Sequence, residues 1–310
     1  MNVIDVQDLT KIYQRGMRKR GIVALDNVTF SVQQGEVIGL LGPNGAGKTT
    51  FLKVLLGITR PTTGTIIIAG LSPTDPMSRQ KIGYLPENHR FPGYLTGLGF
   101  LKFAGRLYGL MHEELDERAG RLLELVGMDK WAGTKLKKYS KGMSQRIGLA
   151  QALMCDPEIL LLDEPTDGVD PVGKVEIRRV LEKIRGEGKT IVLSSHLLAE
   201  VETIADRVAI LSKGRLLRVS TVEELTIRDN LFEIQAEIGS IIVKIPPKMG
   251  RILSITSKRL IVKLANEDDI NYLIDQLRMK RITIRSIRPV KASLEQSFIE
   301  TLGAVTEEVT

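Results

Sequence analysis

The chain of 310 residues is poor in cysteine and in long apolar runs. Its single cysteine, Cys155, excludes an intramolecular disulfide framework and fits a reducing compartment. No apolar run approaches the roughly 18 residues that a membrane span requires, and residues 1–5 lack the basic and apolar regions of a signal peptide. We therefore expect a cytoplasmic protein, for which another chain performs any membrane crossing.

Aromatic residues are also scarce, at 5% of the chain, so any local cluster of them is notable. Hydrophobic residues make up 43% and charged residues 26%, a balance that is typical of a globular protein and excludes a disordered one. The length predicts one large domain, alone or with a small one. The net charge of +7 would suit nucleic acid or anionic lipid, but without a patch it is a weak signal.

A glycine-rich segment is the strongest signal in the chain. Residues 42–49 read GPNGAGKT and fill every fixed position of G-x-x-x-x-G-K-[ST], the phosphate-binding loop or Walker A motif. The apolar run at 37–41 predicts a buried strand before it, and residues 50–56 carry apolar side chains at helical spacing after it. The alternative is a chance glycine turn, which this strand–loop–helix context disfavours.

Such a loop turns its backbone N–H groups toward phosphate oxygens, and the helix that follows adds its positive N-terminal end. Lys48 is expected to reach the β- and γ-phosphates, and the hydroxyl of Thr49 is expected to ligate Mg²⁺. The candidate nucleotide-binding residues in this segment are Gly42, Pro43, Asn44, Gly45, Ala46, Gly47, Lys48, Thr49 and Thr50.

Two carboxylates follow a second apolar run. Asp163 and Glu164 come directly after residues 159–162, which read ILLL. A carboxylate at the end of a buried strand beside a phosphate loop suits Mg²⁺, and the next one can orient the attacking water. The alternative is an acidic pair that simply faces solvent at the end of a strand.

Up to about residue 222 the chain alternates strand-like and helix-like segments. The expected strands lie at residues 3–6, 24–30, 37–41, 65–68, 159–162, 190–193 and 208–211, and helices are expected within 122–126, 143–153 and 174–185. The later strands are continuous apolar runs, as buried parallel strands require. No strand signal appears from 99 to 138, so we expect a helical insertion at about 88–150.

The pattern changes after about residue 220 to that of a small α+β domain, 223–310. Strands are expected at 231–238, 241–245 and 282–287, a hairpin at 252–255 and 260–264, helices at 268–279 and 293–302, and a frayed end at 304–310.

Between the two phosphate-site motifs, residues 139–146 read YSKGMSQR at the start of a helix. This segment resembles the signature motif of ATP-binding-cassette (ABC) ATPases, usually LSGGQ. Residues 163–166 (DEPT), 168–171 (GVDP) and 194–196 (SSH) match further motifs in the order of that family. The resemblance covers about residues 1–220. It implies an α/β P-loop NTPase cassette with a mostly parallel core sheet, an antiparallel β subdomain and a helical insertion.

In that family two cassettes pair head to tail, and each ATP lies between the phosphate loop of one and the signature of the other. The resemblance therefore implies a homodimer in which the second copy supplies Ser140, Lys141, Gly142 and Met143. It further implies that His196 contacts the γ-phosphate and holds Glu164, so that Lys48, Glu164 and His196 form the catalytic set. Asp170 would couple the two sites.

Tyr13 stands where the family usually has an aromatic residue that stacks on adenine. A tyrosine at this position can also pack on the sheet at the end of its strand, and both readings stay open. Since stacking suits any flat base, this contact gives little base specificity.

Two motifs depart from the usual pattern. Lys141 replaces the first glycine of the signature and Met143 its glutamine, which could weaken packing against the partner's nucleotide or add positive charge. Glu87 replaces the glutamine of the family's Q-loop. The carboxylate of Glu87 can still ligate Mg²⁺, so the metal candidates are Thr49, Glu87 and Asp163. The same carboxylate would repel a γ-phosphate that carries no metal.

The resemblance implies the ATPase subunit of an exporter, peripheral on the inner face of the cell membrane, that energises separate integral-membrane subunits. The aromatic cluster over residues 88–108 would receive a coupling helix from those subunits. We expect Phe100 and Phe103 to be mostly buried there, and Phe91 and Tyr94 to be partly exposed. The basic run at 15–20 fits a solvated hairpin tip or a contact with lipid headgroups.

The alternative function is a soluble ABC ATPase that acts on nucleic acid or ribosomes, which the basic composition slightly favours. Against it, the chain has one cassette, and no long heptad run lies between 87 and 139. We therefore expect ATP and Mg²⁺ as ligands, no nucleic acid partner, and a cargo that the membrane subunits select.

Overall fold

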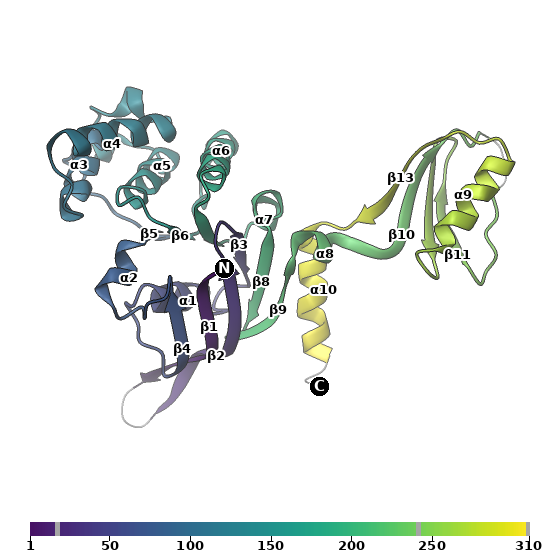
Figure 1. The fold of residues 1–310 in the computed structure, drawn as a ribbon, viewed down its shortest axis with the longest axis horizontal. Helices are drawn as coiled ribbons and strands as arrows, with labels where there is room; N and C mark the ends of the chain where they lie inside the picture. The colour runs from purple at the N-terminus through teal and green to yellow at the C-terminus, as the bar shows by residue number, and fades with distance from the viewer. Residues whose placement is uncertain (16–18, 240–242, 308–310) are drawn as a thin grey trace. The chain divides into compact units, whose positions relative to one another are not determined.

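The computed structural model describes residues 1–15, 19–239 and 243–307, which divide into two compact units (Figure 1). The first unit contains residues 1–222 and also the end of the chain from residue 301, and the second contains residues 223–300. The sequence-based division assigned that final stretch to the small domain, whereas the structure groups it with the first unit.

A six-stranded mixed sheet forms the centre of the first unit. Its strand order is β5-β6-β7-β3-β8-β9, and all neighbours are parallel except β8 and β9. The strands are β3 (Val37–Leu41), β5 (Ile82–Leu85), β6 (Ile159–Asp163), β7 (Thr190–Ser194), β8 (Arg207–Ser212) and β9 (Arg215–Thr221). Every residue of β3, β6 and β7 is buried, which explains why these strands read as continuous apolar runs.

A three-stranded antiparallel sheet with the order β2-β1-β4 forms the second layer of this unit. Its strands are β1 (Asn2–Arg15), β2 (Lys19–Gln33) and β4 (Thr63–Ile68). Residues 16–18, at the centre of the predicted basic loop, lie outside the described residues.

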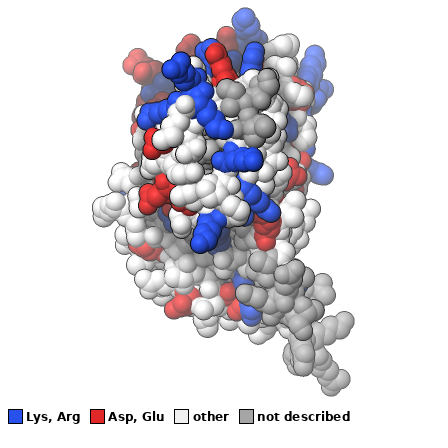
Figure 2. Space-filling view, turned by 90° about the vertical axis from the view of Figure 1, so that its right-hand side faces the viewer, with Lys and Arg blue, Asp and Glu red and all other residues white. Residues whose placement is uncertain are grey.

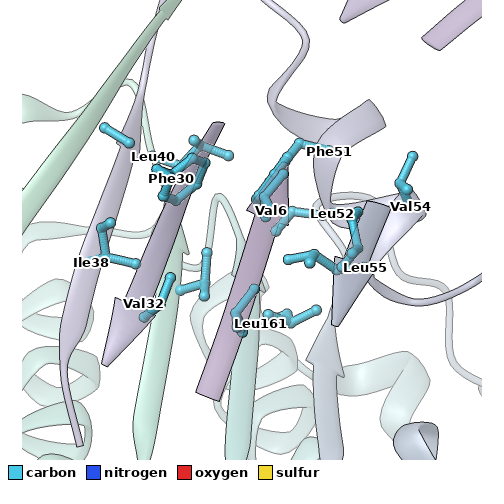
Figure 3. Close-up of a cluster of buried hydrophobic side chains, with 14 of the residues drawn as sticks. Val6, Phe30, Val32, Ile38, Leu40, Phe51, Leu52, Val54, Leu55 and Leu161 are labelled. Atoms are coloured by element: carbon cyan, nitrogen blue, oxygen red, sulfur yellow. The ribbon is translucent and has the colours of Figure 1, made fainter. Parts of the chain in front are cut away.

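The main hydrophobic core joins these two sheets to helix α1 (Lys48–Leu55). Figure 3 shows Phe51, Leu52 and Leu55 of α1 reaching between side chains of β1, β2 and β6. The rings of Phe30 and Phe51 stack with centroids 5.3 Å apart. Since Phe51 is only 1% exposed, this packing fixes the position of α1 and of the phosphate-binding loop at its start.

The helical insertion is present as expected. It contains α3 (Gly97–Leu107), α4 (His112–Leu125), two short 3₁₀ helices (Asp129–Trp131 and Leu136–Lys138) and α5 (Lys141–Ala152). The remaining helices of the unit are α2 (Pro76–Gln80), α6 (Pro171–Gly186) and α7 (Leu198–Ile204), and α8 (Val222–Thr226) begins at its boundary. Side chains that accept backbone N–H groups begin four of these helices: Asp75 for α2, Thr96 for α3, Ser140 for α5 and Asp170 for α6.

The second unit has a four-stranded antiparallel sheet with the order β11-β12-β10-β13. Its elements are β10 (Ile227–Ala236), β11 (Gly250–Ile255), β12 (Arg259–Leu264), α9 (Asp269–Met279), β13 (Ile284–Lys291) and the first part of α10 (Leu294–Glu307). Leu273 and Leu277 of α9 join one face of the sheet in a separate hydrophobic core.

Several predicted elements differ from the structure. The strand predicted at 241–245 is wrong where the structure describes it, because residues 243–245 have no strand structure and 241 and 242 lie outside the described residues. Residues 304–307, predicted to be frayed, continue α10. Strands β5 and β9 were missed. β5 is only four residues long, and it contains Gly83, where a Cβ would lie 2.2 Å from the carbonyl oxygen of Ala152.

None of the helices in the described part of the chain combines the length and apolar composition that a membrane span needs. The mixed core sheet, the antiparallel β layer and the helical insertion together form the α/β fold that the motifs predicted.

Candidate nucleotide site

The phosphate-binding loop connects β3 to α1. Gly47 has a φ of 109°, and a Cβ at this position would lie 2.5 Å from the carbonyl oxygen of Ala24, so only glycine fits without displacing the backbone. Lys48 is 7% exposed, and its Nζ donates to the carbonyl oxygen of Gly42 at 2.6 Å. The lysine ammonium is therefore held against the loop that is expected to receive phosphate groups.

A cavity of about 440 Å³ opens beside this loop. It is lined by Ile22, Val23, Ala24, Pro43, Asn44, Gly45, Ala46, Gly47, Lys48, Thr49, Thr50, Glu87, Asp163, Glu164 and His196. The structure thus brings together the loop, the two carboxylates, the Q-loop glutamate and the histidine from four separate stretches of sequence. Gly42 is buried and does not line the cavity.

Asp163 and Glu164 lie where β6 ends, beside the end of β7. Asp163 is 2% exposed and pairs in register with Ser194 of β7. Glu164 is 7% exposed, and its Oε2 lies 2.8 Å from Nδ1 of His196 and accepts the backbone N–H of His196 at 3.3 Å. The buried carboxylate therefore has its partner in the same cavity, while the imidazole keeps 47% of its surface exposed.

The backbone of Glu164 adopts a left-handed conformation, with φ at 52°. Its N–H donates to the carbonyl oxygen of Ser194 at 2.9 Å, and its own carbonyl accepts the N–H of Asp167 at 3.2 Å. A non-glycine residue in this conformation is uncommon and is often found at functional sites. These hydrogen bonds hold the carboxylate at the edge of the sheet.

Glu87 is exposed and lines the cavity just after β5. Its negative charge and that of Asp163 act on nearby Tyr84. Burial, followed by the charges of Asp163 and Glu87, raises the pKa of Tyr84 to about 12. Burial is thus the main cause of the raised pKa, and the two nearby carboxylates add to it.

The donor set fits Mg²⁺. Among the described residues no group of three or more His, Cys, Asp or Glu side chains forms a ready metal cage. Mg²⁺ does not need one, because it usually binds one or two carboxylates together with water and substrate phosphates. Thr49, Glu87 and Asp163 line one cavity and could supply these protein oxygens.

Tyr13 does not line the cavity. It lies on β1 opposite Ile22 of β2, is 37% exposed, and has the Nζ of Lys11 5.0 Å from its ring centroid. The apolar lining beside the loop comes instead from Ile22 and Val23 of the neighbouring strand. Sequence reasoning missed these two residues, because only the register of the β1–β2 pair places them there.

The signature residues also lie outside this cavity. Ser140 is the N-cap of α5, and its Oγ accepts the N–H of Met143 at 3.2 Å, which leaves its hydroxyl proton to donate elsewhere. Gly142 is buried, and Met143 is half-buried. The contribution of these residues to a second chain's nucleotide stays a prediction.

Lys141 makes a contact that the sequence motifs did not predict. Its Nζ lies 2.7 Å from Oδ2 of Asp167. The hydrogen bond from Lys141 lowers the pKa of Asp167, and burial opposes this effect.

Asp170, which is predicted to couple two sites, accepts the N–H of Gly173 at 2.9 Å and caps α6.

The aromatic cluster is partly as expected. Phe100 is buried at 7% exposure, Phe91 is half-buried against it with ring centroids 4.5 Å apart, and Tyr94 is 75% exposed. The expectation that Phe103 is buried is wrong, since it is 49% exposed. The buried residues of α3 are Gly97, Phe100, Leu101, Ala104 and Gly105, and helical geometry turns residue 103 away from that stripe.

Comparison with known proteins assigns the family. The family model described as "ABC transporter" matches residues 25–167. An uncharacterized ABC transporter ATP-binding protein of Synechocystis is 38% identical over 97% of this chain and 85% of its own length. The Nod factor export ATP-binding protein I of Cupriavidus metallidurans is 35% identical over 72% of each chain.

A solved structure agrees with these relatives. The ATP-binding cassette MJ0796, in a dimeric post-hydrolysis state bound to ADP and phosphate, superimposes with a TM-score of 0.65 at 28% identity. The match covers 71% of this chain and 98% of that one. The chain belongs to the ABC transporter family and is an ATP-binding, ATP-hydrolysing cassette.

Proposed function

We propose that this cassette powers an exporter, by hydrolysing Mg²⁺-ATP as a homodimer attached to separate integral-membrane subunits. The observation that carries the proposal is the single cavity that combines the phosphate-binding loop with Asp163, Glu164 and His196.

In the proposed reaction, the loop binds the phosphates of ATP. The backbone N–H groups around Gly45 and the N-terminus of α1 favour negative charge, and Lys48 moves from the carbonyl of Gly42 to the β- and γ-phosphate oxygens. A Cβ at Gly45 would meet nothing within 4 Å, so the loop is open to a ligand on that side. The phosphate-binding loop thus contributes by positioning the phosphates and neutralising their charge.

Mg²⁺ would be held by the hydroxyl of Thr49 and by Asp163, with Glu87 as a further oxygen donor. When bound, the metal neutralises charge on the β- and γ-phosphates. Asp163 remains fixed for this role because it is buried at the end of β6.

Glu164 would orient and polarise the attacking water. His196 holds the glutamate carboxylate through its ring nitrogen and backbone N–H, and its exposed surface leaves it free to contact a γ-phosphate. The pair therefore supplies both a hydrogen-bond acceptor for water and a donor near the phosphate.

A second copy would complete the site. Ser140, with its hydroxyl proton free, and the N–H groups at the start of α5 form an anion-binding group that lies outside the chain's own cavity. This separation supports a head-to-tail dimer in which each α5 faces the partner's γ-phosphate.

The membrane partner would dock on the helical insertion. Tyr94 before α3 and Phe103 and Leu107 on α3 are exposed apolar side chains, at 75%, 49% and 74%. Phe103 and Leu107 are four residues apart and share one face of the helix.

The proposed direction of transport, export, rests on the relative that is named for Nod factor export. This reading places the cassette in the cytoplasm, at the inner face of the membrane.

We propose an accessory or regulatory role for the second unit, because it folds around its own core. Replacing the fully buried Leu273 with Asp would disrupt that core selectively. A regulatory role predicts altered ATP turnover with retained ATP binding, and unchanged turnover would argue against it.

The test of the main proposal is affinity purification of the tagged chain from its own cells after mild detergent extraction. Co-purification with a multi-span membrane protein, lost in a Tyr94→Asp/Phe103→Asp variant that still hydrolyses ATP, would support it. ATP-dependent binding to nucleic acid or ribosomes at physiological salt would favour the alternative function.

The distribution of charge bears on this alternative. Figure 2 shows one face on which Lys and Arg side chains are interspersed with Asp and Glu and are not gathered in one patch.

A further inference from the structure

Two motifs of the cassette that are far apart in the sequence are linked by an ion pair. Lys141 stands at the first position of α5, and Asp167 lies in the turn that follows β6, 26 residues later. Their side chains meet at 2.7 Å, and hydrogen bonding to Lys141 lowers the pKa of Asp167. The signature segment is therefore joined to the segment that carries the catalytic carboxylate of the same chain.

The contact continues through the neighbouring residues. A Cβ at Gly168, whose φ is 62°, would lie 2.3 Å from the Nζ of Lys141, so the lysine side chain lies directly over this glycine. A Cβ at Gly142 would lie 3.3 Å from Cγ1 of Val169, which is 6% exposed. The first turn of α5 and residues 167–169 are thus packed closely against each other.

Local helix energetics do not explain a lysine at this position. A cation in the first turn of a helix is opposed by the positive end of the helix dipole. Asp167 supplies the opposite charge that this environment lacks. Both side chains are about half exposed, and ion pairs of this kind contribute little to global stability. The pair is therefore better explained by the geometry that it maintains.

Asp167 is also connected to Glu164. Its N–H donates to the Glu164 carbonyl at 3.2 Å, so a displacement of Asp167 would pull on the strained backbone of the glutamate. We propose that Lys141 and Asp167 are positioning residues that tie the signature end of α5 to the Glu164 turn, so that engagement of a partner's nucleotide by α5 also sets the chain's own Glu164. This inference rests on the proposed dimeric ATPase.

A double-mutant cycle tests the link. The proteins are the wild type, Lys141→Met, Asp167→Asn and the double variant, with Lys141→Arg as the conservative change. We expect each single neutral variant to lower kcat roughly five- to tenfold, and the double variant to fall no further than the worse single, because residues in direct contact are not additive. Lys141→Arg should keep kcat within about twofold, since it retains the charge.

Two readouts separate positioning from loss of structure. The thermal midpoint and the Mg²⁺-free affinity for ATP should stay at wild-type values in all variants, because neither depends on the α5 contact. The matched control is Asp156→Asn, which removes a similar Lys–Asp pair with Lys189, at 2.6 Å, before the other end of β6. It should leave kcat unchanged.

Additive losses in the cycle, or wild-type kcat in Asp167→Asn, would overturn the inference while leaving the ATPase proposal intact. A wild type whose ATP hydrolysis is absent or insensitive to Lys48→Ala would instead overturn the proposed reaction, and this inference with it.

Discussion

The carboxylate of Glu164 lies 2.8 Å from Nδ1 of His196, and the same carboxylate oxygen accepts the backbone N–H of His196 at 3.3 Å. An ionised carboxylate can only accept hydrogen bonds, so the contact with Nδ1 is a hydrogen bond in the tautomer that carries its proton on Nδ1. The glutamate is buried at the edge of the sheet while the histidine faces the cavity. In the proposed reaction, Glu164 would orient the attacking water and His196 would hold the Glu164 carboxylate.

Replacing Glu164 with Gln should leave ATP binding intact and lower turnover by at least about a hundredfold, the usual scale for general-base and positioning groups. Glutamine fills the same space but cannot polarise water as a carboxylate does. The variant should accumulate as an ATP-bound dimer, measured by size-exclusion chromatography with light scattering. A monomeric variant with wild-type turnover would refute the role assigned to Glu164.

Replacing Lys48 with Ala should weaken ATP binding or turnover strongly. In the structure its ammonium is buried against the carbonyl of Gly42, and no other Lys or Arg lines the cavity within the part of the chain that the structure describes. Loss of a charged hydrogen-bond donor from a buried phosphate site costs roughly 2–5 kcal/mol. Equilibrium titration with a fluorescent ATP analogue measures the loss.

The control for Lys48→Ala is Lys53→Ala, which removes a charge from the exposed face of the same helix. It should leave the affinity for ATP nearly unchanged. Equal losses in both variants would indicate a general effect of charge and would contradict direct phosphate binding by Lys48.

Replacing Glu87 with Gln should reduce the dependence of ATP binding on Mg²⁺. The carboxylate lines the cavity, where it can ligate the metal and repels a metal-free γ-phosphate. The ratio of Kd without Mg²⁺ to Kd with Mg²⁺ should fall roughly three- to tenfold in the variant, which corresponds to about 0.7–1.4 kcal/mol. An unchanged ratio would exclude a role of Glu87 in metal dependence.

The chain's local motifs predicted its fold and most of its site. Residues 42–49 have the strand before them and the helix after them in the structure, because glycines and apolar runs act over short distances. The phase of α3 could also have placed Phe103 correctly, since positions 97, 100, 101 and 104 define a stripe that excludes it.

Other features depend on contacts between distant segments. Ile22 and Val23 line the cavity because β1 and β2 pair in one register, with Tyr13 opposite Ile22. The ion pair of Lys141 and Asp167 depends on how α5 packs against the end of β6. The periodicity of a single sequence does not predict which strands pair in which register or which distant side chains form ion pairs. Only the folded chain reveals these two contacts.

The ionisation of Tyr84 should report the charge in the nucleotide site. Burial, Asp163 and Glu87 raise its pKa from 10.0 to about 12, so the neutral phenol is favoured in the folded state. The resulting stabilisation is fully present below pH 10 and is lost as the pH rises through about 12. Glu87→Gln removes one of the three causes. The pH at which half of Tyr84 is ionised, the titration midpoint, should therefore move down toward 10 without reaching it.

The tyrosinate absorbance of wild type minus that of Tyr84→Phe isolates this group, with circular dichroism confirming that both proteins stay folded over the range compared. The control is Glu267→Gln, which removes a charge from the second unit and should leave the midpoint in place. Because the burial of Tyr84 and the charge of Asp163 persist in Glu87→Gln, a midpoint that drops completely to 10 would mean that the glutamate alone perturbs the tyrosine. A midpoint identical to wild type would mean that Glu87 is too well solvated to act on its neighbours, and would also weaken its assignment as a metal ligand.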